Sequence, residues 1–75
     1  MLTDDYYIDA LGRQAVATER ASIAYSQALV DGEDALQEER ALAYEAAEYV
    51  RMMNAATPVQ LIVHAAERAQ SFRGH

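Results

Sequence analysis

Two interruptions divide this chain into three segments whose apolar residues recur with the spacing of an α-helix. The first is the acidic turn Asp31-Gly32-Glu33-Asp34, and the second is Pro58, the single proline. Glycine accepts the positive φ that ends a helix, and the residue before a proline is driven out of helical dihedrals. The pattern predicts an all-α chain with a long helix over about 4–31, a second over about 33–54 and a shorter third over about 58–72.

The connections predict how these helices are arranged. A short turn forces the first two helices to lie antiparallel, as a long hairpin. The third helix has a clear start, because Thr57 suits the cap, Pro58 suits the first helical position and Gln60 completes a capping box. A chain of 75 residues forms one domain, residues 1–75, and its sixteen alanines build a thin core. Thin cores favour burial between chains, so we expect a homodimer or a higher homo-oligomeric bundle.

Helical phase predicts which side chains face the core. The second helix carries two apolar lines and is expected to pack against two neighbours at once; the lines are Leu36, Ala43, Ala47 and Val50, and Ala35, Leu42, Tyr49 and Met53. The packing line of the first helix is Ile8, Leu11, Ala15, Ser22 and Leu29, with Val16, Ile23 and Val30 beside it. The apolar face of the third helix is Val59, Ile62, Ala65, Ala66, Ala69 and Phe72, opposite Gln60, His64, Glu67 and Ser71. Gly12 is expected to permit a close approach by another helix.

The charge of the chain excludes several classes of partner. Its net charge is −6, and all six basic residues are arginine. Phosphate contacts dominate nucleic-acid affinity and require positive charge, so we expect no direct binding to nucleic acid or to anionic membranes. A protein with a basic surface is the better match. No run approaches the length of a membrane span, and the acidic start MLTDDYY differs from a signal peptide, so we expect a cytoplasmic protein.

Carboxylates are the residues most suited to chemistry. Helical bundles hold di-metal sites with Glu and Glu-x-x-His ligands, and this chain offers the pairs Glu45/Glu48 and His64/Glu67, the latter in reversed order. The simpler interpretation is an acidic face in solvent. The chain has no cysteine, no Gly-rich phosphate loop and no Ser–His–Asp grouping that the pattern supports. We therefore expect no enzymatic activity, no metal and no cofactor, and keep a carboxylate metal site as an alternative.

One acidic residue falls on the packing side of the first helix. Glu19 lies on the line that contains Val16 and Ile23, where an unpaired carboxylate is costly. An arginine of the antiparallel second helix is expected to pair with it. The candidates for this structural ion pair are Arg40 and Arg51.

A contact patch is predicted on the second helix. Interfaces are enriched in Tyr and Met, so Tyr44 and Met52 are its proposed centre. The surrounding charged residues are Glu38, Glu45, Glu48 and Arg51. The alternative is that Tyr44 and Met52 fold back over neighbouring apolar side chains.

These features favour a small acidic helical protein that acts stoichiometrically on another protein, as an adaptor or an inhibitor. One form of this hypothesis is a phage or mobile-element protein directed at a nucleic-acid-binding or defence enzyme of the host. The second hypothesis is an oligomer that holds a small anionic ligand between subunits, through Arg13, Arg20, Arg40 and tyrosines. The third is the carboxylate metal site.

Overall fold

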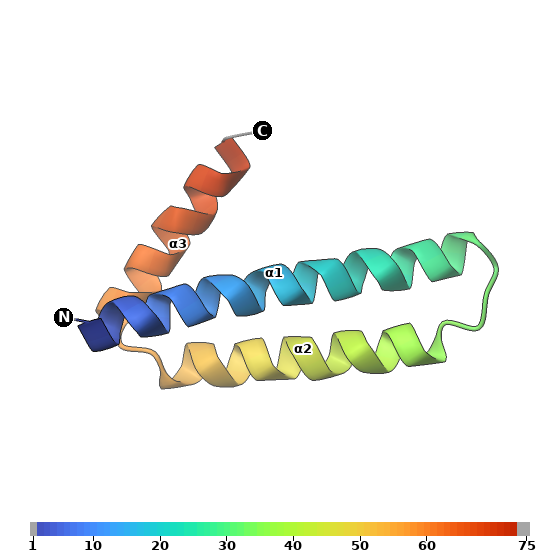
Figure 1. The fold of residues 1–75 in the computed structure, drawn as a ribbon, viewed down its shortest axis with the longest axis horizontal. Coiled ribbons are helices and arrows are strands. Elements are labelled where there is room, and N and C mark those ends of the chain that lie inside the picture. The colour runs from blue at the N-terminus through green and yellow to red at the C-terminus, as the bar shows by residue number, and fades with distance from the viewer. Residues whose placement is uncertain (1, 74–75) are drawn as a thin grey trace.

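Three helices joined by two short connections, 31–35 and 56–57, form the described chain in the computed structural model, which describes residues 2–73, with side chains over 5–71. They are α1 (Leu2–Val30), α2 (Leu36–Ala55) and α3 (Pro58–Arg73), and there is no strand within this range. α1 and α2 form a long antiparallel hairpin, and α3 crosses α1 near its N-terminal end and then leaves it at a steep angle (Figure 1). The all-α prediction is confirmed, and the main shift in bounds is at α2, which begins at Leu36 rather than near 33.

The turn after α1 has the hydrogen bonds of a Schellman motif. Gly32 has a φ of 74°, its N–H donates to the carbonyl of Leu29 at 3.2 Å, and the N–H of Glu33 donates to that of Ala28 at 3.0 Å. Asp34 then accepts a bond from the N–H of Leu36 at 3.2 Å, so three residues of the acidic turn are used to close one helix and open the next.

The capping box predicted at the start of α3 is present. The N–H of Thr57 donates to Oε1 of Gln60 at 2.8 Å, and the N–H of Gln60 donates to Oγ1 of Thr57 at 3.2 Å. These two bonds satisfy N–H groups that a helix start leaves without partners. The capping box therefore fixes the residue at which α3 begins and the chain changes direction.

The buried apolar core is small. It consists of Ile8, Leu11, Ala15, Ala28 and Ala35. Three of these lie on the N-terminal half of α1, where α3 crosses it. Polar bonds supplement the contact between α1 and α2, since the hydroxyl of Tyr7 donates to the carbonyl of Met52 at 2.6 Å.

The expectation that both apolar lines of α2 pack is wrong. Ala35 is buried and Leu42, Tyr49 and Met53 are half-buried, whereas every member of the other line, Leu36, Ala43, Ala47 and Val50, is exposed. The physical reason is the direction in which α1 lies. α1 packs against the side of α2 that bears Glu38, Glu45 and Met52, which are half-buried. The exposed line consequently has no neighbour within the chain.

The predicted orientation of α3 is also wrong. His64 and Gln60 are 2% and 8% exposed, whereas Ile62 is 69% exposed. The polar residues lie inside because each has a partner there: Gln60 closes the capping box, His64 meets Tyr49, and Arg68 pairs with Glu19. The apolar face of α3 points outward, and of its predicted members only Phe72 lies outside the residues whose side chains are described.

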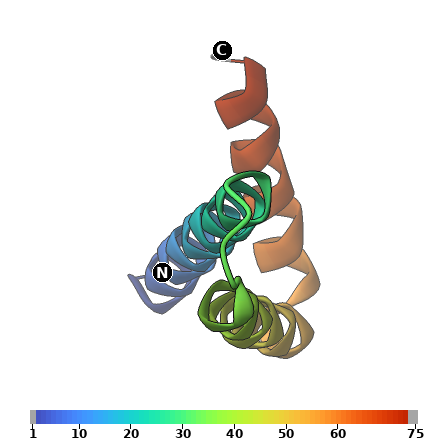
Figure 2. The ribbon, with the colours of Figure 1, turned by 90° about the vertical axis from the view of Figure 1, so that its right-hand side faces the viewer.

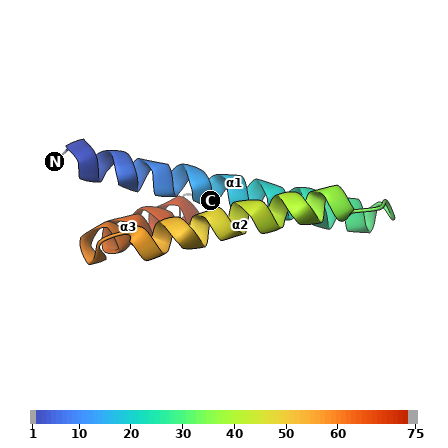
Figure 3. The same ribbon diagram turned by 90° about the horizontal axis from the view of Figure 1, so that it is seen from below.

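Gly12 does not serve a close helix approach within the chain. A Cβ placed on it would meet nothing within 4 Å, so the expectation of tight packing at this point is wrong. α3 lies to one side of the plane of the hairpin, as Figures 2 and 3 show from two directions. The molecule measures 46 × 27 × 16 Å, which is long and thin for its size.

Candidate functional site

The residues predicted as a contact patch lie on α2, where Tyr44 and Arg51 are exposed and Glu38, Glu45, Glu48 and Met52 are half-buried. We call them the α2 patch: Glu38, Tyr44, Glu45, Glu48, Arg51 and Met52. Tyr44 is 70% exposed and stands clear of the helix surface. Met52 is half-buried, so of the two central residues only Met52 folds back toward neighbouring side chains. The aromatic centre of the patch is therefore Tyr44 alone.

Glu48 and Arg51 form an ion pair on the rim of this patch. Nε of Arg51 donates to Oε2 of Glu48 at 3.2 Å, and a second guanidinium nitrogen contacts Oε1. The hydrogen bond from Arg51 holds the pKa of the Glu48 carboxyl below its ordinary value, and the same bond raises the pKa of Arg51. Both side chains keep their charge near neutral pH, so the rim presents a fixed pair beside Tyr44.

Glu45 has a structural role that the sequence pattern did not predict. Nε2 of Gln14 on α1 donates to both the carbonyl oxygen and Oε1 of Glu45, each at 2.9 Å. The hydroxyl of Thr18 donates to the same carbonyl at 3.2 Å. Glu45 thus links the two helices of the hairpin, whereas Glu38 is half-buried and makes no hydrogen bond or ion pair among the described residues.

The partner of Glu19 differs from the one predicted. Glu19 pairs with Arg68 of α3, and Arg51 pairs with Glu48 on its own helix, so the predicted Glu19 pair with Arg40 or Arg51 is corrected. The prediction placed the partner on α2 because it assumed that α2 faces this side of α1. The Glu19 side chain is half exposed and that of Arg68 is largely covered, so the pair fastens α3 across α1.

A second link between α3 and the hairpin joins Tyr49 to His64. The Tyr49 hydroxyl lies 2.6 Å from Nε2 of His64, and the two rings meet edge to face with centroids 5.7 Å apart. Burial raises the pKa of the Tyr49 hydroxyl. Nδ1 of His64 is buried without a hydrogen-bond partner among the described residues. Helical phase predicted that His64 faces solvent. The sequence feature that could have indicated its contact with Tyr49 is spacing, because the two residues are equally far along the chain from the connection between α2 and α3.

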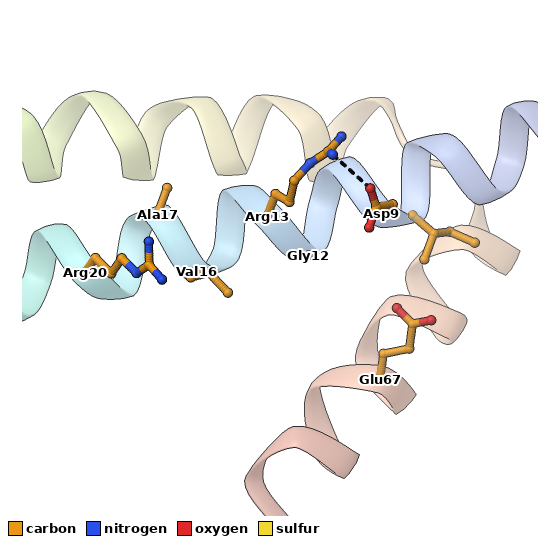
Figure 4. Close-up of a pocket in the computed structure, with 8 residues that line it drawn as sticks. Asp9, Gly12, Arg13, Val16, Ala17, Arg20 and Glu67 are labelled. Atoms are coloured by element: carbon orange, nitrogen blue, oxygen red, sulfur yellow. Dashed lines mark ion pairs between the residues drawn. The ribbon is translucent and has the colours of Figure 1, made fainter.

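A groove runs between α1 and α3, with a volume of about 480 Å³. Its lining is Ile8, Asp9, Gly12, Arg13, Val16, Ala17, Arg20 and Glu67 (Figure 4). Arg13 pairs with Asp9 at 3.0 Å, and Glu67 projects from α3 toward α1. The lining holds two basic and two acidic side chains, and Arg40 of α2 is not part of it. This balance gives an anionic ligand no net attraction within one chain.

The carboxylates of the metal alternative do not converge. Over the described residues there is no group of three or more potential ligands placed to hold a metal ion. His64 is directed at Tyr49, while its predicted companion Glu67 lines the groove. None of the three helices, over residues 2–73, contains a stretch that is long and apolar enough to cross a lipid bilayer.

Comparison of the chain with protein-family models, with curated proteins and with solved structures gives no significant match in any of the three cases. The geometry of the α2 patch and the charge of the chain are therefore the observations on which a function can be argued.

Proposed function

We propose that this protein is a non-enzymatic interaction module that binds another protein stoichiometrically through the α2 patch. The observation that carries the proposal is Tyr44, a large side chain 70% exposed in the middle of a helix. Tyr is enriched in interfaces and loses little conformational entropy on binding, because it has only two side-chain torsions. The Glu48–Arg51 pair beside it is already ordered, which lowers the entropy cost of contact further.

The charge of the chain defines the chemistry of the partner. A net charge of −6 steers a small protein toward a basic surface and repels nucleic acid. A basic groove that ordinarily holds nucleic acid fits this description. The proposed role is accordingly that of an adaptor or inhibitor in the cytoplasm, in the form of a phage or mobile-element protein that occupies such a groove on a host enzyme.

Site-specific photo-crosslinking in the source cells tests this proposal. A photoreactive amino acid is placed at position 44, and the matched control carries it at Gln70, an exposed position on α3. The proposal predicts one partner crosslinked at 44 and absent at 70. Crosslinks at 70 to a different protein, with none at 44, would show that the α2 patch is not the binding surface.

Substitutions then separate charge from shape. Glu38→Lys is the cleanest charge reversal, because Glu45 and Glu48 are engaged by Gln14 and Arg51 within the chain. We expect Glu38→Lys and Tyr44→Ala each to weaken binding of the crosslinked partner and Gln70→Ala to leave it unchanged. Binding should also weaken as salt is raised, since exposed charges are screened over about 10 Å at 0.1 M salt.

A further inference from the structure

The packing line of α1 is covered along only half of its length. Ile8, Leu11 and Ala15 are buried where α3 crosses. The same line continues at helical spacing toward the hairpin turn, where its members are exposed: Ser22, Ile23, Ser26, Leu29 and Val30. Ile23 is 67% exposed although it lies on the side of α1 that α3 occupies further back. The line therefore lacks a neighbour at its distal end.

The uncovered residues of α1 lie at helical phases close to those of Ile8 and Ala15, on the side of the helix that α3 occupies further back. We call this surface the distal face: Ser22, Ile23, Ser26, Leu29 and Val30 of α1. None of these five side chains is charged.

The outer face of α3 is a second surface of the same chemistry. It consists of Val59, Ile62, Ala65, Ala66 and Ala69, all exposed and uncharged. α3 has 16 residues and is about 24 Å long, while the uncovered part of α1, Glu19–Val30, spans about 18 Å. A helix of this size can lie over the distal face along most of its length.

A single chain exposes more surface than a compact monomer of its mass, and the excess is close to the area that one partner buries in an interface. The accessible surface is 5610 Å², whereas a compact monomer of 8.3 kDa exposes about 4,600 Å² by the scaling of surface with mass. The excess, about 1,000 Å², compares with about 800 Å² that each partner buries in a standard interface. The Cα radius of gyration, 14.3 Å, likewise exceeds the value of about 11 Å for a compact chain of this length.

We propose that a second copy of this chain covers these surfaces, with the outer face of each α3 lying on the distal face of the other copy. A two-fold arrangement of this kind uses both surfaces twice and leaves neither exposed. A second copy is the occupant that fits, because one chain carries both halves of the contact and both are free of the charges that make two chains of net −6 repel. The distal face belongs to α1 and the α2 patch to α2, so this inference does not rest on the proposed function.

Sedimentation equilibrium of the full chain at micromolar concentration tests the dimer. The expected mass is twice that of the 8.3 kDa chain. Ile62→Glu places a charge in the proposed contact and should raise the dimer dissociation constant by about tenfold or more. Tyr44→Glu is the matched control, at nearly equal exposure on α2 and outside both proposed contact surfaces, and should leave the dimer intact. A monomeric wild-type chain, or equal effects of the two substitutions, would overturn the proposal.

Crosslinking identifies the faces even if Ile62→Glu fails to fold. The chain has no cysteine, so single cysteines are unambiguous. A Ser26→Cys chain mixed with an Ala66→Cys chain should give the mixed product with a short bis-maleimide. The control is Ala24→Cys, an exposed position that lies about 160° from Ser26 around the helix. A mixed product with Ala24→Cys and none with Ser26→Cys would overturn the assignment of faces.

Discussion

The hydroxyl of Tyr49 on α2 and Nε2 of His64 on α3 lie 2.6 Å apart, and their rings meet at an interplanar angle of 69°. His64 is 2% exposed, so this bond is made in a nearly water-free position. Nδ1 of the same ring has no partner, so the bond to Tyr49 is the imidazole's one hydrogen bond within the described residues. The position of α3 on the hairpin depends on this contact and on the Glu19–Arg68 ion pair.

Tyr49→Phe removes the hydroxyl and leaves the imidazole with two buried polar atoms and no partner. Loss of a buried partner costs about 1–3 kcal/mol, so the free energy of unfolding should fall by that amount. Urea unfolding followed by circular dichroism measures it. Tyr44→Phe removes an exposed hydroxyl and is the control, with almost no expected change. An unchanged free energy of unfolding in Tyr49→Phe would mean that His64 is not held by this bond.

The Tyr49 hydroxyl should ionise above the ordinary tyrosine pKa. Burial raises its pKa above the ordinary value of 10.0, so the unfolded state loses this proton first as the pH rises. Its contribution to stability is therefore complete below about pH 10 and is lost as the pH rises through the folded value. A titration by near-ultraviolet absorbance should lose a component above pH 10.0 in Tyr49→Phe. Loss of a lower component instead would contradict the burial of Tyr49.

The contributions of Glu19 and Arg68 to stability should be coupled. Reversal of either charge, Glu19→Arg or Arg68→Glu, puts like charges at the α1–α3 contact, and the double reversal restores an attractive pair. Because Glu19 is half exposed, we expect a coupling energy below about 1 kcal/mol, with partial recovery in the double variant. Hydrogen exchange of α3 amides reports the effect locally. Additive losses would show that the two side chains do not interact in solution.

The two internal glycines should respond oppositely to alanine. A Cβ on Gly12 meets nothing, so Gly12→Ala should raise the free energy of unfolding by about 0.5–1 kcal/mol through helix propensity. Gly32 has a φ of 74°, which an alanine adopts only at a cost of about 1–2 kcal/mol. Thermal unfolding of both variants is the measurement. Destabilisation by Gly12→Ala would indicate that another chain packs at that point.

The elements of this fold could be predicted because their signals are local. Gly32 ends α1 through its own backbone conformation, and Thr57 and Gln60 cap α3 through bonds that span three residues. The antiparallel hairpin follows from the length of the turn between the helices. Each of these features depends on a few neighbouring residues, and each is confirmed in kind, with bounds that differ by a few residues.

The orientation of α3 could not be predicted, because it depends on partners distant in sequence. Helical phase identified an apolar face that contains Ile62 and a polar face that contains His64, and the usual expectation buries the first. In this chain Tyr49 and Glu19 satisfy the polar face, so the apolar face is left outside. Helical phase also does not identify the element that covers an apolar line. On the hairpin, Ile23 and Leu36 belong to predicted packing lines and are nevertheless exposed.

For the candidate site, the sequence pattern predicted which residues take part better than it predicted how they are arranged. Tyr44 stands exposed beside charged side chains, as the spacing indicates. Glu45 and Met52, however, belong partly to the contact with α1, through Gln14 and Tyr7. Those bonds join side chains to backbone carbonyls of α2, and a pattern of residue types contains no information about them.

Native mass spectrometry of the protein, isolated gently from its source cells without chelator, is the measurement that tests the central claim most directly. The account predicts a species that contains whole copies of the 8.3 kDa chain together with the mass of one other protein, and this added mass should disappear in Tyr44→Ala. Bare multiples of the chain, or an added mass no larger than that of a small ligand or a metal ion, would contradict the proposal that this protein acts by binding another protein.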